Sequence, residues 1–298
     1  DKAEFCKHRL CPVCNWRKSL KLFSQMKAVS AELMQEFPTA RYLFLTLTVK
    51  NVTGDELAST IDAMNDGFKR LVNKGLTVAS AKSVKANLLG YAKAMEIKYD
   101  SEKFITEQMY ANRKQYYIAR GLKAGNQNLN YGMYHPHFHV LLMVKSSFFT
   151  TGYIKQSQWT SIWRDCMKLD YDPQVDIRAI KSNKARMAEG DLKEQAMTSA
   201  ISETLKYPVK PDSLKLEEYE NMTDEQKEKI TNAIICLSHA LSRRRLVTFG
   251  GEILKARKKL KQDDVEDGDL IGEDGEPVPE NEFELVMFKW MKIGCYVC

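Results

Sequence analysis

Three of the five histidines in this sequence lie at alternate positions of one segment, residues 134–144. Successive side chains of a β-strand point to opposite faces, so His135, His137 and His139 would share one face and the apolar residues among them the other. Alternate strand positions are about 7 Å apart, close enough for two imidazoles to bind one ion. The pattern therefore predicts a metal-binding strand. The alternative, histidines that are only solvated or satisfied by hydrogen bonds, suits a lone histidine better than three.

Glu96 is the acidic residue that could complete such a site. It lies in segment 91–99, whose composition predicts a second strand, and it has apolar neighbours on both sides. If this strand pairs antiparallel with 134–144, Glu96 joins His137 and His139 in a two-histidine, one-carboxylate site. Such a site leaves coordination positions open for a phosphate oxygen. The alternative is a surface glutamate on a half-exposed strand.

A second candidate metal site lies near the start of the sequence, where Cys6, Cys11 and Cys14 form a Cys-x4-Cys-x2-Cys pattern ahead of a predicted helix. Thiolates in this arrangement hold a tetrahedral, structural zinc ion. The odd total of seven cysteines fits metal binding or reduced cytosolic thiols better than a disulfide framework. Free thiols packed in a turn are the alternative. The fourth zinc ligand is left open between His8, Cys295, Cys298 and a cysteine upstream.

A candidate nucleophile lies near the end of a predicted helix. Glu203 and Tyr207 are separated by four positions, so they would share one helix face, and Pro208 would end the helix immediately afterwards. A phenol at a helix end can reach a neighbouring strand, and Lys206 and Lys210 would lower its pKa or hold a phosphate. Taken alone, an ordinary tyrosine beside a helix-face glutamate explains this pattern as well.

The elements that must position these residues follow from hydrophobic periodicity and from capping signals. The predicted elements, in order, are a helix over 16–37, a strand over 42–49, a helix from a capping box at 53 to about 71, strands over 91–99 and 134–144, a helix over 159–167, a strand over 175–180 and helices over 191–207 and 223–242. A long connection, 100–131, separates the two site strands. This order indicates an α+β fold with a central antiparallel sheet and helices on one face.

Charge and composition narrow the class of protein. The 298 residues carry a formal charge of +6, but residues 263–284 contain eleven acids and no Lys or Arg, so the rest of the chain carries +17. A basic surface suits a polyphosphate partner, although solvated lysines explain basicity equally well without a site. No apolar run reaches the length of about 18 residues that a membrane span needs, and the start shows no signal-peptide pattern.

Three of these segments, taken together, resemble the ordered motifs of the rolling-circle replication initiators of small bacterial plasmids, within the HUH endonuclease superfamily. The matching segments are Leu45-Thr46-Leu47-Thr48, His135-Pro136-His137-Phe138-His139, and Glu203-x3-Tyr207 with Lys206 and Lys210. The cysteine segment resembles the N-terminal block of the same family. The resemblance covers about residues 6–250.

The resemblance implies a ferredoxin-like HUH nuclease fold and a metal-dependent, site-specific single-strand DNA endonuclease. His137, His139 and Glu96 would bind Mg²⁺ or Mn²⁺, with His135 as a supporting or alternate ligand, and the cysteines would bind Zn²⁺. Tyr207 would attack the scissile phosphate, leaving a 5′-phosphotyrosyl link and a free 3′-hydroxyl. Glu203 would activate water for the terminating cleavage. The residues implied in DNA binding are Thr46, Thr48, Lys206 and Lys210.

The resemblance also implies an organisation and a set of partners. Residues 1–40 would form the zinc-binding segment and helix, 41–210 the endonuclease domain, and 211–298 a helical and acidic extension. The partners would be origin DNA, as a hairpin or single-stranded nick site, and the host helicase and replication machinery, in the bacterial cytoplasm without a membrane. Whether 211–298 docks on the sheet, recognises the origin or forms a homodimer is left open.

Rival functions remain in view. A relaxase or transposase of the same superfamily would share the ion site. A non-enzymatic, zinc-dependent DNA-binding regulator would explain the basic charge and the cysteines, but it would leave the alternating histidines without a task. A His-x-His metal oxygenase would use the histidines but would not need the excess of basic residues.

Overall fold

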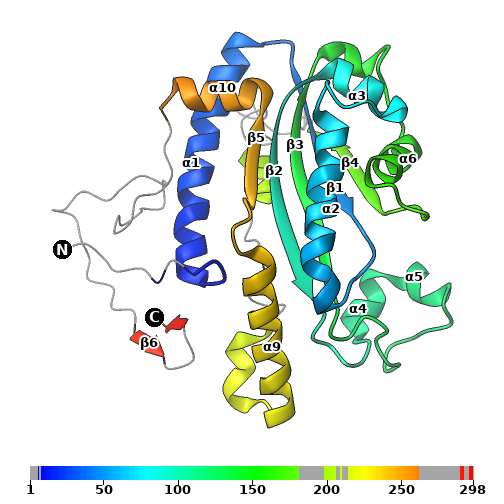
Figure 1. Ribbon diagram of the computed structural model, residues 1–298, viewed down its shortest axis with the longest axis vertical. Helices are drawn as coiled ribbons and strands as arrows, with labels where there is room; N and C mark the ends of the chain where they lie inside the picture. Colours follow the sequence, from blue (N-terminus) through cyan, green and yellow to red (C-terminus); the bar gives the residue numbers. More distant parts are fainter. Residues whose placement is uncertain are drawn as a thin grey trace, which may run out of the picture.

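The structure is a computed structural model that describes residues 6, 8–180, 198–205, 209, 214–261, 289–291 and 295–297 (Figure 1). Its elements are α1 (Pro12–Glu36), β1 (Arg41–Thr48), α2 (Gly54–Val72), η1 (Ala79–Ala81), α3 (Lys82–Asn87), β2 (Leu88–Tyr99), α4 (Glu107–Asn112), α5 (Lys114–Ile118), β3 (Tyr134–Val144), η2 (Ser146–Phe149), α6 (Gln156–Met167), β4 (Val175–Ala179), η3 (Leu216–Asn221), α9 (Asp224–Leu241), β5 (Val247–Gly250), α10 (Gly251–Lys259), β6 (Lys289–Met291) and β7 (Cys295–Val297). Residues 198–204 are also helical.

A five-stranded sheet in the order β4-β1-β3-β2-β5 forms the centre of the molecule, and each neighbouring pair is antiparallel. The predicted pairing of the two site strands is confirmed, with Glu96 opposite His137. On the other side of β3, β1 places Thr46 opposite His139 and Thr48 opposite His137. The histidine strand is thus the middle strand, and both of its neighbours contribute polar side chains to one face.

The apolar face of the sheet packs under α2, α6 and α9. Leu45, Phe138, Val140 and Leu142 are buried there with residues of the three helices. The helix α2 begins at the predicted capping box, because the Thr53 N–H donates to the Glu56 carboxylate at 3.1 Å. Helices on this face and an antiparallel sheet confirm the α+β class.

On the second face of the sheet, the described residues that form an apolar cover lie towards the far end of the site strands. Helices α1 and α10 and the helical residues 198–204 pack against Leu141 and Met143 in a separate apolar cluster. The sequence pattern did not predict this cover. It leaves the histidine end of the same face as the place where the site residues reach the protein surface.

Residues 214–261 pack on the same sheet, and β6 and β7 pair with each other in a separate two-stranded sheet. The short strand β5 pairs with β2, α9 packs on α2, and α10 lies against α1 (Figure 1). Arg244, which follows α9, forms an ion pair with Asp62 of α2 at 2.6 Å. Of the arrangements left open for this segment, docking on the sheet is therefore observed for residues 214–261. Among the helices that the structure describes, none is long and apolar enough to cross a membrane.

The N-terminal helix begins earlier than its hydrophobic pattern predicted. It starts at Pro12, directly after Cys11. Proline suits the first helical turn because a backbone N–H at that position would have no acceptor within the helix. It ends at Glu36, just before Pro38. Trp16, predicted on the apolar face, is 45% exposed, so that face begins further along the helix.

Candidate metal centre

Two neighbouring strands bring Glu96, His137 and His139 together. The His139 Nε2 lies 2.9 Å from the Glu96 Oε2, and the His137 Nε2 lies 3.6 Å from the same oxygen. The ligand atoms of all three side chains lie within 4.8 Å of one another. The antiparallel register produces this convergence, because Glu96 is directly opposite His137 and one alternate position along from the partner of His139.

The site carries a negative charge at its centre. Glu96 is only 4% exposed. Burial raises the pKa of its carboxyl, but hydrogen bonds and positive charge from His137 and His139 outweigh burial and hold that pKa well below its usual range. Glu96 is therefore ionised at neutral pH, as a carboxylate ligand must be.

Contacts to the other ring nitrogen orient both histidines. The His137 Nδ1 lies 3.2 Å from the His135 carbonyl oxygen, which can only accept, so Nδ1 donates there. Nε2 faces Glu96 and can bind a cation through its lone pair once its own proton is released. The His139 Nδ1 lies 3.4 Å from the Thr46 hydroxyl, and Phe44 stacks on its ring at 5.5 Å. These contacts hold the two Nε2 atoms facing Glu96.

The arrangement fits a divalent cation. The ligand atoms of an octahedral ion with bonds of about 2.1 Å are about 3 Å apart, close to the two separations to Glu96. Two imidazole nitrogens and one carboxylate form the donor set that transition metals accept while keeping other positions open. Nitrogen donors favour Mn²⁺ over Mg²⁺, which prefers oxygen ligands. The identity of the ion stays a prediction.

His135 lies outside this group of three ligands. Its Nδ1 is 2.9 Å from the Asn51 Oδ1. Burial, together with positive charge from His137, Arg113 and Lys98, lowers the pKa of its ring to about 4, so His135 is neutral. In the structure it supports the site through its carbonyl contact to His137 rather than as a ligand.

The hydroxyl groups of Thr46 and Thr48, the threonines of the first motif, both contact other residues of the protein. Thr46 contacts His139, and the buried Thr48 donates its hydroxyl hydrogen to the Gln174 carbonyl at 2.7 Å. Both therefore stabilise the face that carries the site. A direct contact of these hydroxyls with DNA stays a prediction.

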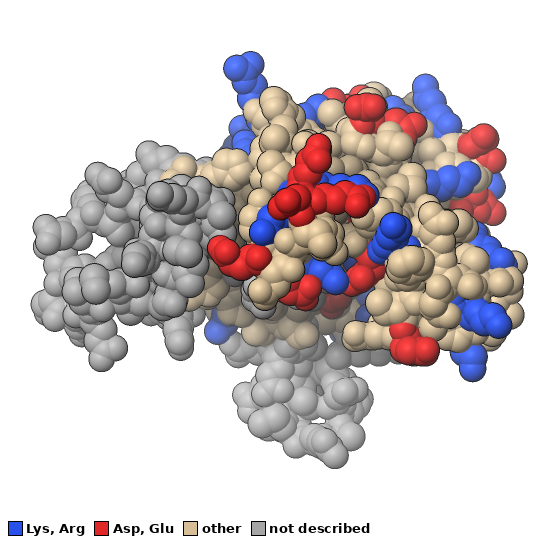
Figure 2. Space-filling view, turned by 90° about the horizontal axis from the view of Figure 1, so that it is seen from below, with Lys and Arg blue, Asp and Glu red and all other residues tan. Residues whose placement is uncertain are grey.

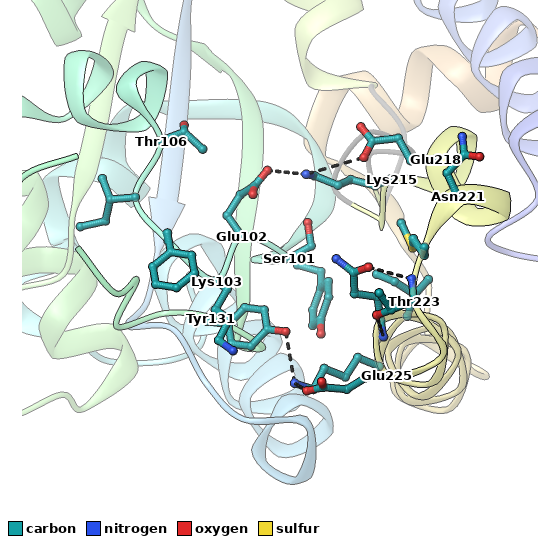
Figure 3. Close-up of a pocket in the computed structure, with 17 residues that line it drawn as sticks. Ser101, Glu102, Lys103, Thr106, Tyr131, Lys215, Glu218, Asn221, Thr223 and Glu225 are labelled. Carbon is teal, nitrogen blue, oxygen red and sulfur yellow. Dashed lines mark hydrogen bonds and ion pairs between the residues drawn. The ribbon is translucent and has the colours of Figure 1, made fainter. Parts of the chain in front are cut away.

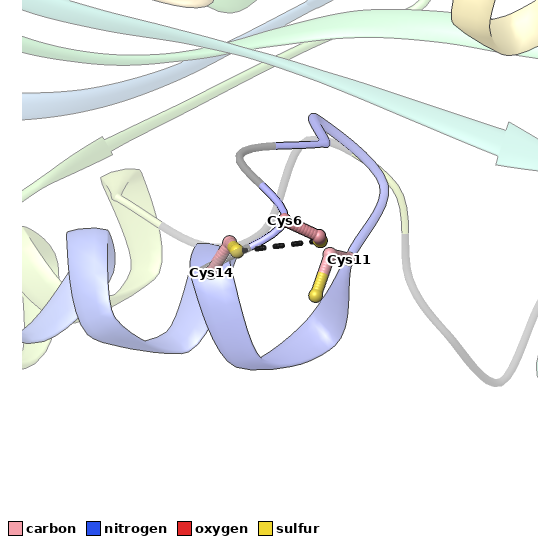
Figure 4. Close-up of side chains that lie close together, drawn as sticks. All are labelled: Cys6, Cys11 and Cys14. Atoms are coloured by element: carbon pink, nitrogen blue, oxygen red, sulfur yellow. Dashed lines mark hydrogen bonds between the residues drawn. The ribbon is translucent and has the colours of Figure 1, made fainter. Parts of the chain in front are cut away.

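The three N-terminal cysteines also converge, at the start of α1 (Figure 4). The Cys6 and Cys14 sulfurs are 3.7 Å apart, and all three sulfurs lie within 4.8 Å of one another. Sulfur ligands of a tetrahedral zinc ion with bonds of about 2.3 Å are about 3.8 Å apart, so the geometry fits. Burial raises the pKa of the Cys11 thiol to about 12, so this thiol is protonated unless a cation displaces the proton.

His8, the ligand proposed to complete that cluster, is directed elsewhere in the structure. Its Nδ1 accepts a hydrogen bond from the Leu10 N–H at 3.3 Å, and its Nε2 lies 3.3 Å from the Ser238 hydroxyl of α9. His8 thus attaches the cysteine segment to α9. Cys298 and the side chain of Cys295 lie outside the described residues.

The proposed nucleophile Tyr207, with Lys206 and Lys210, also lies outside the described residues, but the residues around them approach the metal centre. Leu205 packs with Ala92 and Leu141, on the sheet face that carries the ligands. Val209 forms a parallel bridge with Ile97, the residue next to Glu96. Glu203 is partly buried on the helical residues 198–204.

Comparison with known proteins gives the family. Residues 1–295 match the sequence profile of the family described as Replication protein. The chain belongs to this family. "Protein rep" of Bacillus amyloliquefaciens is 36% identical over 99% of this chain and 77% of its own length. "Protein rep" of Streptococcus pneumoniae is 35% identical over 91% and 68%, and "Replication protein" of Staphylococcus aureus is 32% identical over 92% and 97%. No solved structure matches the chain.

Membership of the Replication protein family confirms the resemblance drawn from the three motifs. Sequence patterns nevertheless missed residues that hold the site of this replication protein in place. Asn51 contacts His135, and Phe44 stacks on His139. Phe44 alternates with Thr46 on its strand, so it could have been placed on the site face. Nothing local distinguishes Asn51 from any other residue after a strand.

Proposed function

We propose that this replication protein initiates rolling-circle replication of a plasmid by binding the double-strand origin and nicking one strand. The observation that carries the proposal is the convergence of Glu96, His137 and His139 on the surface end of one sheet face. A DNA-binding regulator without enzymatic activity would have no use for a buried, ionised carboxylate between two oriented imidazoles. Membership of the Replication protein family supports DNA as the substrate.

A divalent cation held by Glu96, His137 and His139 would polarise the scissile phosphate as a Lewis acid. The chain's own residues set the conditions for that role. The ionised Glu96 supplies the negative charge, and the Nδ1 contacts of His137 and His139 keep their Nε2 atoms aimed at the same point. Their partial exposure leaves room for a phosphate on the outer side.

Tyr207 is the proposed nucleophile. The proposal is supported by Val209, two residues further along the chain, which bridges Ile97, the neighbour of Glu96. In the proposed step the phenol loses its proton, its oxygen forms a bond to phosphorus, and the bond from phosphorus to the 3′ oxygen breaks. The products are a 5′-phosphotyrosyl link and a free 3′-hydroxyl, which primes synthesis.

Glu203 would serve the terminating cleavage as a general base that takes a proton from water. The separation of four residues from Tyr207 supports this role, because such residues share one helix face. Converting Glu203 to Gln should leave the first nick unaffected and should impair termination. An unchanged pattern of termination products from Glu203→Gln would contradict the role.

The test is covalent capture of DNA. Single-stranded oligonucleotides tiled across the replicon that encodes the protein are incubated with Mn²⁺, and adducts are separated under denaturing conditions. Wild-type protein should form an adduct with the oligonucleotide that contains the nick site. Tyr207→Phe should form none while still binding that oligonucleotide. Tyr153→Phe, at an exposed tyrosine beside Phe148, is the matched control and should behave as wild type. An adduct formed by Tyr207→Phe would overturn the proposal.

A further inference from the structure

The connection between the two ligand strands is a folded element. Residues 100–133, here the β2–β3 insertion, contain α4 and α5 and are closed by backbone hydrogen bonds such as Asn128 N–H to the Lys103 carbonyl at 2.9 Å. The side chain of Asn128 is buried and donates to both Asp100 and the Glu102 carbonyl at 2.8 Å. The insertion is therefore held rigidly at the sheet end where β2 stops and β3 begins (Figure 1).

One side of the insertion is attached to the C-terminal helices. A cleft separates it from η3 and α9, and ion pairs and hydrogen bonds cross or line that cleft (Figure 3). Lys215 pairs with Glu102 at 2.7 Å, and Lys229 pairs with Glu225 at 2.8 Å and contacts the Tyr131 hydroxyl at 3.2 Å. Lys215 and Lys229 are neutralised where they stand, so these two contacts fix the insertion against η3 and α9.

Two exposed cations, one at the end of β2 and one in the insertion, lie close to His135. Lys98 shares the face of Glu96, two positions along β2, and it is paired with His135 in the sheet. Arg113 lies between α4 and α5, near enough for its charge to act on His135 and Asp100. Both are exposed, and neither forms an ion pair within the described part of the chain.

The charges on the surrounding surface are mixed in sign. Figure 2 views the molecule from the end that carries α9 and the insertion. Acidic and basic side chains are interspersed over the described surface in that view, without a field of a single sign. A polyanion would therefore be held there by particular unpaired cations, and Lys98 and Arg113 are the ones that continue from the metal centre.

Beyond Arg113 the insertion presents stacked rings. The Arg120 guanidinium lies 3.9 Å from the centre of the Tyr116 ring and also donates to the Tyr116 carbonyl at 3.2 Å. Tyr117 packs edge-on against Tyr116 at 5.2 Å and stacks with Tyr110 at 5.9 Å. Unpaired bases stack on such aromatic and guanidinium planes, whereas bases inside a duplex are not available for stacking.

We propose that the β2–β3 insertion is a second contact surface for single-stranded DNA, with Lys98 and Arg113 on successive phosphates and the Tyr116–Arg120 stack under a base. The strand bound at the metal centre continues across His135 onto this surface. The inference rests on the proposed nicking function for the identity of the strand, but the binding surface is testable without chemistry.

The first test measures binding of a fluorescent twenty-nucleotide thymidine oligonucleotide in EDTA at several salt concentrations. Each phosphate contact to single-stranded DNA contributes about 0.7 to the slope of log K against log salt. The double variant Lys98→Ala with Arg113→Ala should therefore lose about 1.4 of that slope. Lys145→Ala is the control, because Lys145 is exposed at the opposite end of β3 and should leave the slope unchanged.

The second test addresses the stacked rings. Tyr116→Ala should weaken binding of the same oligonucleotide roughly 5- to 150-fold, the range for loss of one stacked base. Tyr116→Phe keeps the ring and should bind nearly as wild type, which separates stacking from a folding defect. Tyr153→Ala, at a 60% exposed tyrosine away from the insertion, should also bind as wild type.

The outcomes separate this inference from the proposed function. If the wild-type protein nicks DNA but the Lys98 and Arg113 variant keeps the full salt slope, the inference is overturned and the nicking function stands. If the slope falls as expected while the wild-type protein nicks no oligonucleotide, the surface stands and the nicking function fails. The inference would also be overturned if the Lys98 and Arg113 double variant bound a twenty-base-pair duplex more weakly than wild type but bound the single strand equally well.

Discussion

The two candidate metal-binding groups of this protein are built in opposite ways. Glu96, His137 and His139 come from adjacent strands whose register is fixed by the hydrogen bonds of a five-stranded sheet, and their outer side reaches the surface. Cys6, Cys11 and Cys14 come from one short segment, and two of the three are fully buried. A metal site that binds a phosphate needs free coordination positions and ligands held on rigid strands. A structural metal site that holds one short segment together needs no free coordination position.

The largest effect should follow from removing a ligand of the strand site. Glu96→Ala or His137→Ala should lower the nicking rate by about 10³-fold or more, because stabilisation of transition-state charge by a bound ion contributes several kcal/mol. Nicking rates measured over a Mn²⁺ titration test this. His239→Ala, at an exposed histidine of α9, should nick at the wild-type rate. Equal rates for the ligand variants and wild type would remove the metal centre from the mechanism.

Removing a cysteine should affect the protein differently. Cys14→Ser should abolish stoichiometric zinc and lower the melting temperature, because three thiolates are needed to hold the start of α1. The nicking rate of the folded variant should fall less than tenfold, since the cysteine cluster shares no residue with the strand site. Metal analysis and thermal unfolding measure the two effects. Cys236→Ser, outside the cluster, is the control, and full zinc content in Cys14→Ser would disprove the assignment.

A smaller change should follow from loosening an orienting contact. Thr46→Val removes the hydroxyl beside the His139 Nδ1 and should weaken Mn²⁺ binding about 10- to 100-fold, as removal of such supporting contacts does elsewhere. Calorimetric titration measures this. Thr48→Val, whose hydroxyl bonds Gln174 instead, should reduce stability and leave Mn²⁺ affinity close to wild type. If the two variants bind Mn²⁺ equally, Thr46 does not orient the ligand.

Much of the strand site could be predicted because its signals are local. Alternation along the strand places His137 and His139 on the same face. A metal site also needs an acidic ligand, which selects Glu96 and with it the register between the two strands. The features that the sequence did not predict depend on contacts between residues far apart in the chain. The strand β5 has four residues and no clear alternation, so only its pairing with β2 defines it. Lys93, a polar residue in the same strand as Glu96, gives no hint that it is buried against Phe138 and bonded to Asn65.

His8 is the sharpest case of such a distant contact, and it gives the smallest predicted effect. It was one of the candidates for the fourth zinc ligand, whereas the structure turns its Nε2 towards the Ser238 hydroxyl. His8→Ala should therefore keep the full zinc content and lower the melting temperature by at most about 4 °C, the loss expected for one hydrogen bond. Ser238→Ala should cause a similar shift. If His8→Ala instead lost zinc as Cys14→Ser does, His8 would be a ligand, and the thiolate cluster would include a histidine.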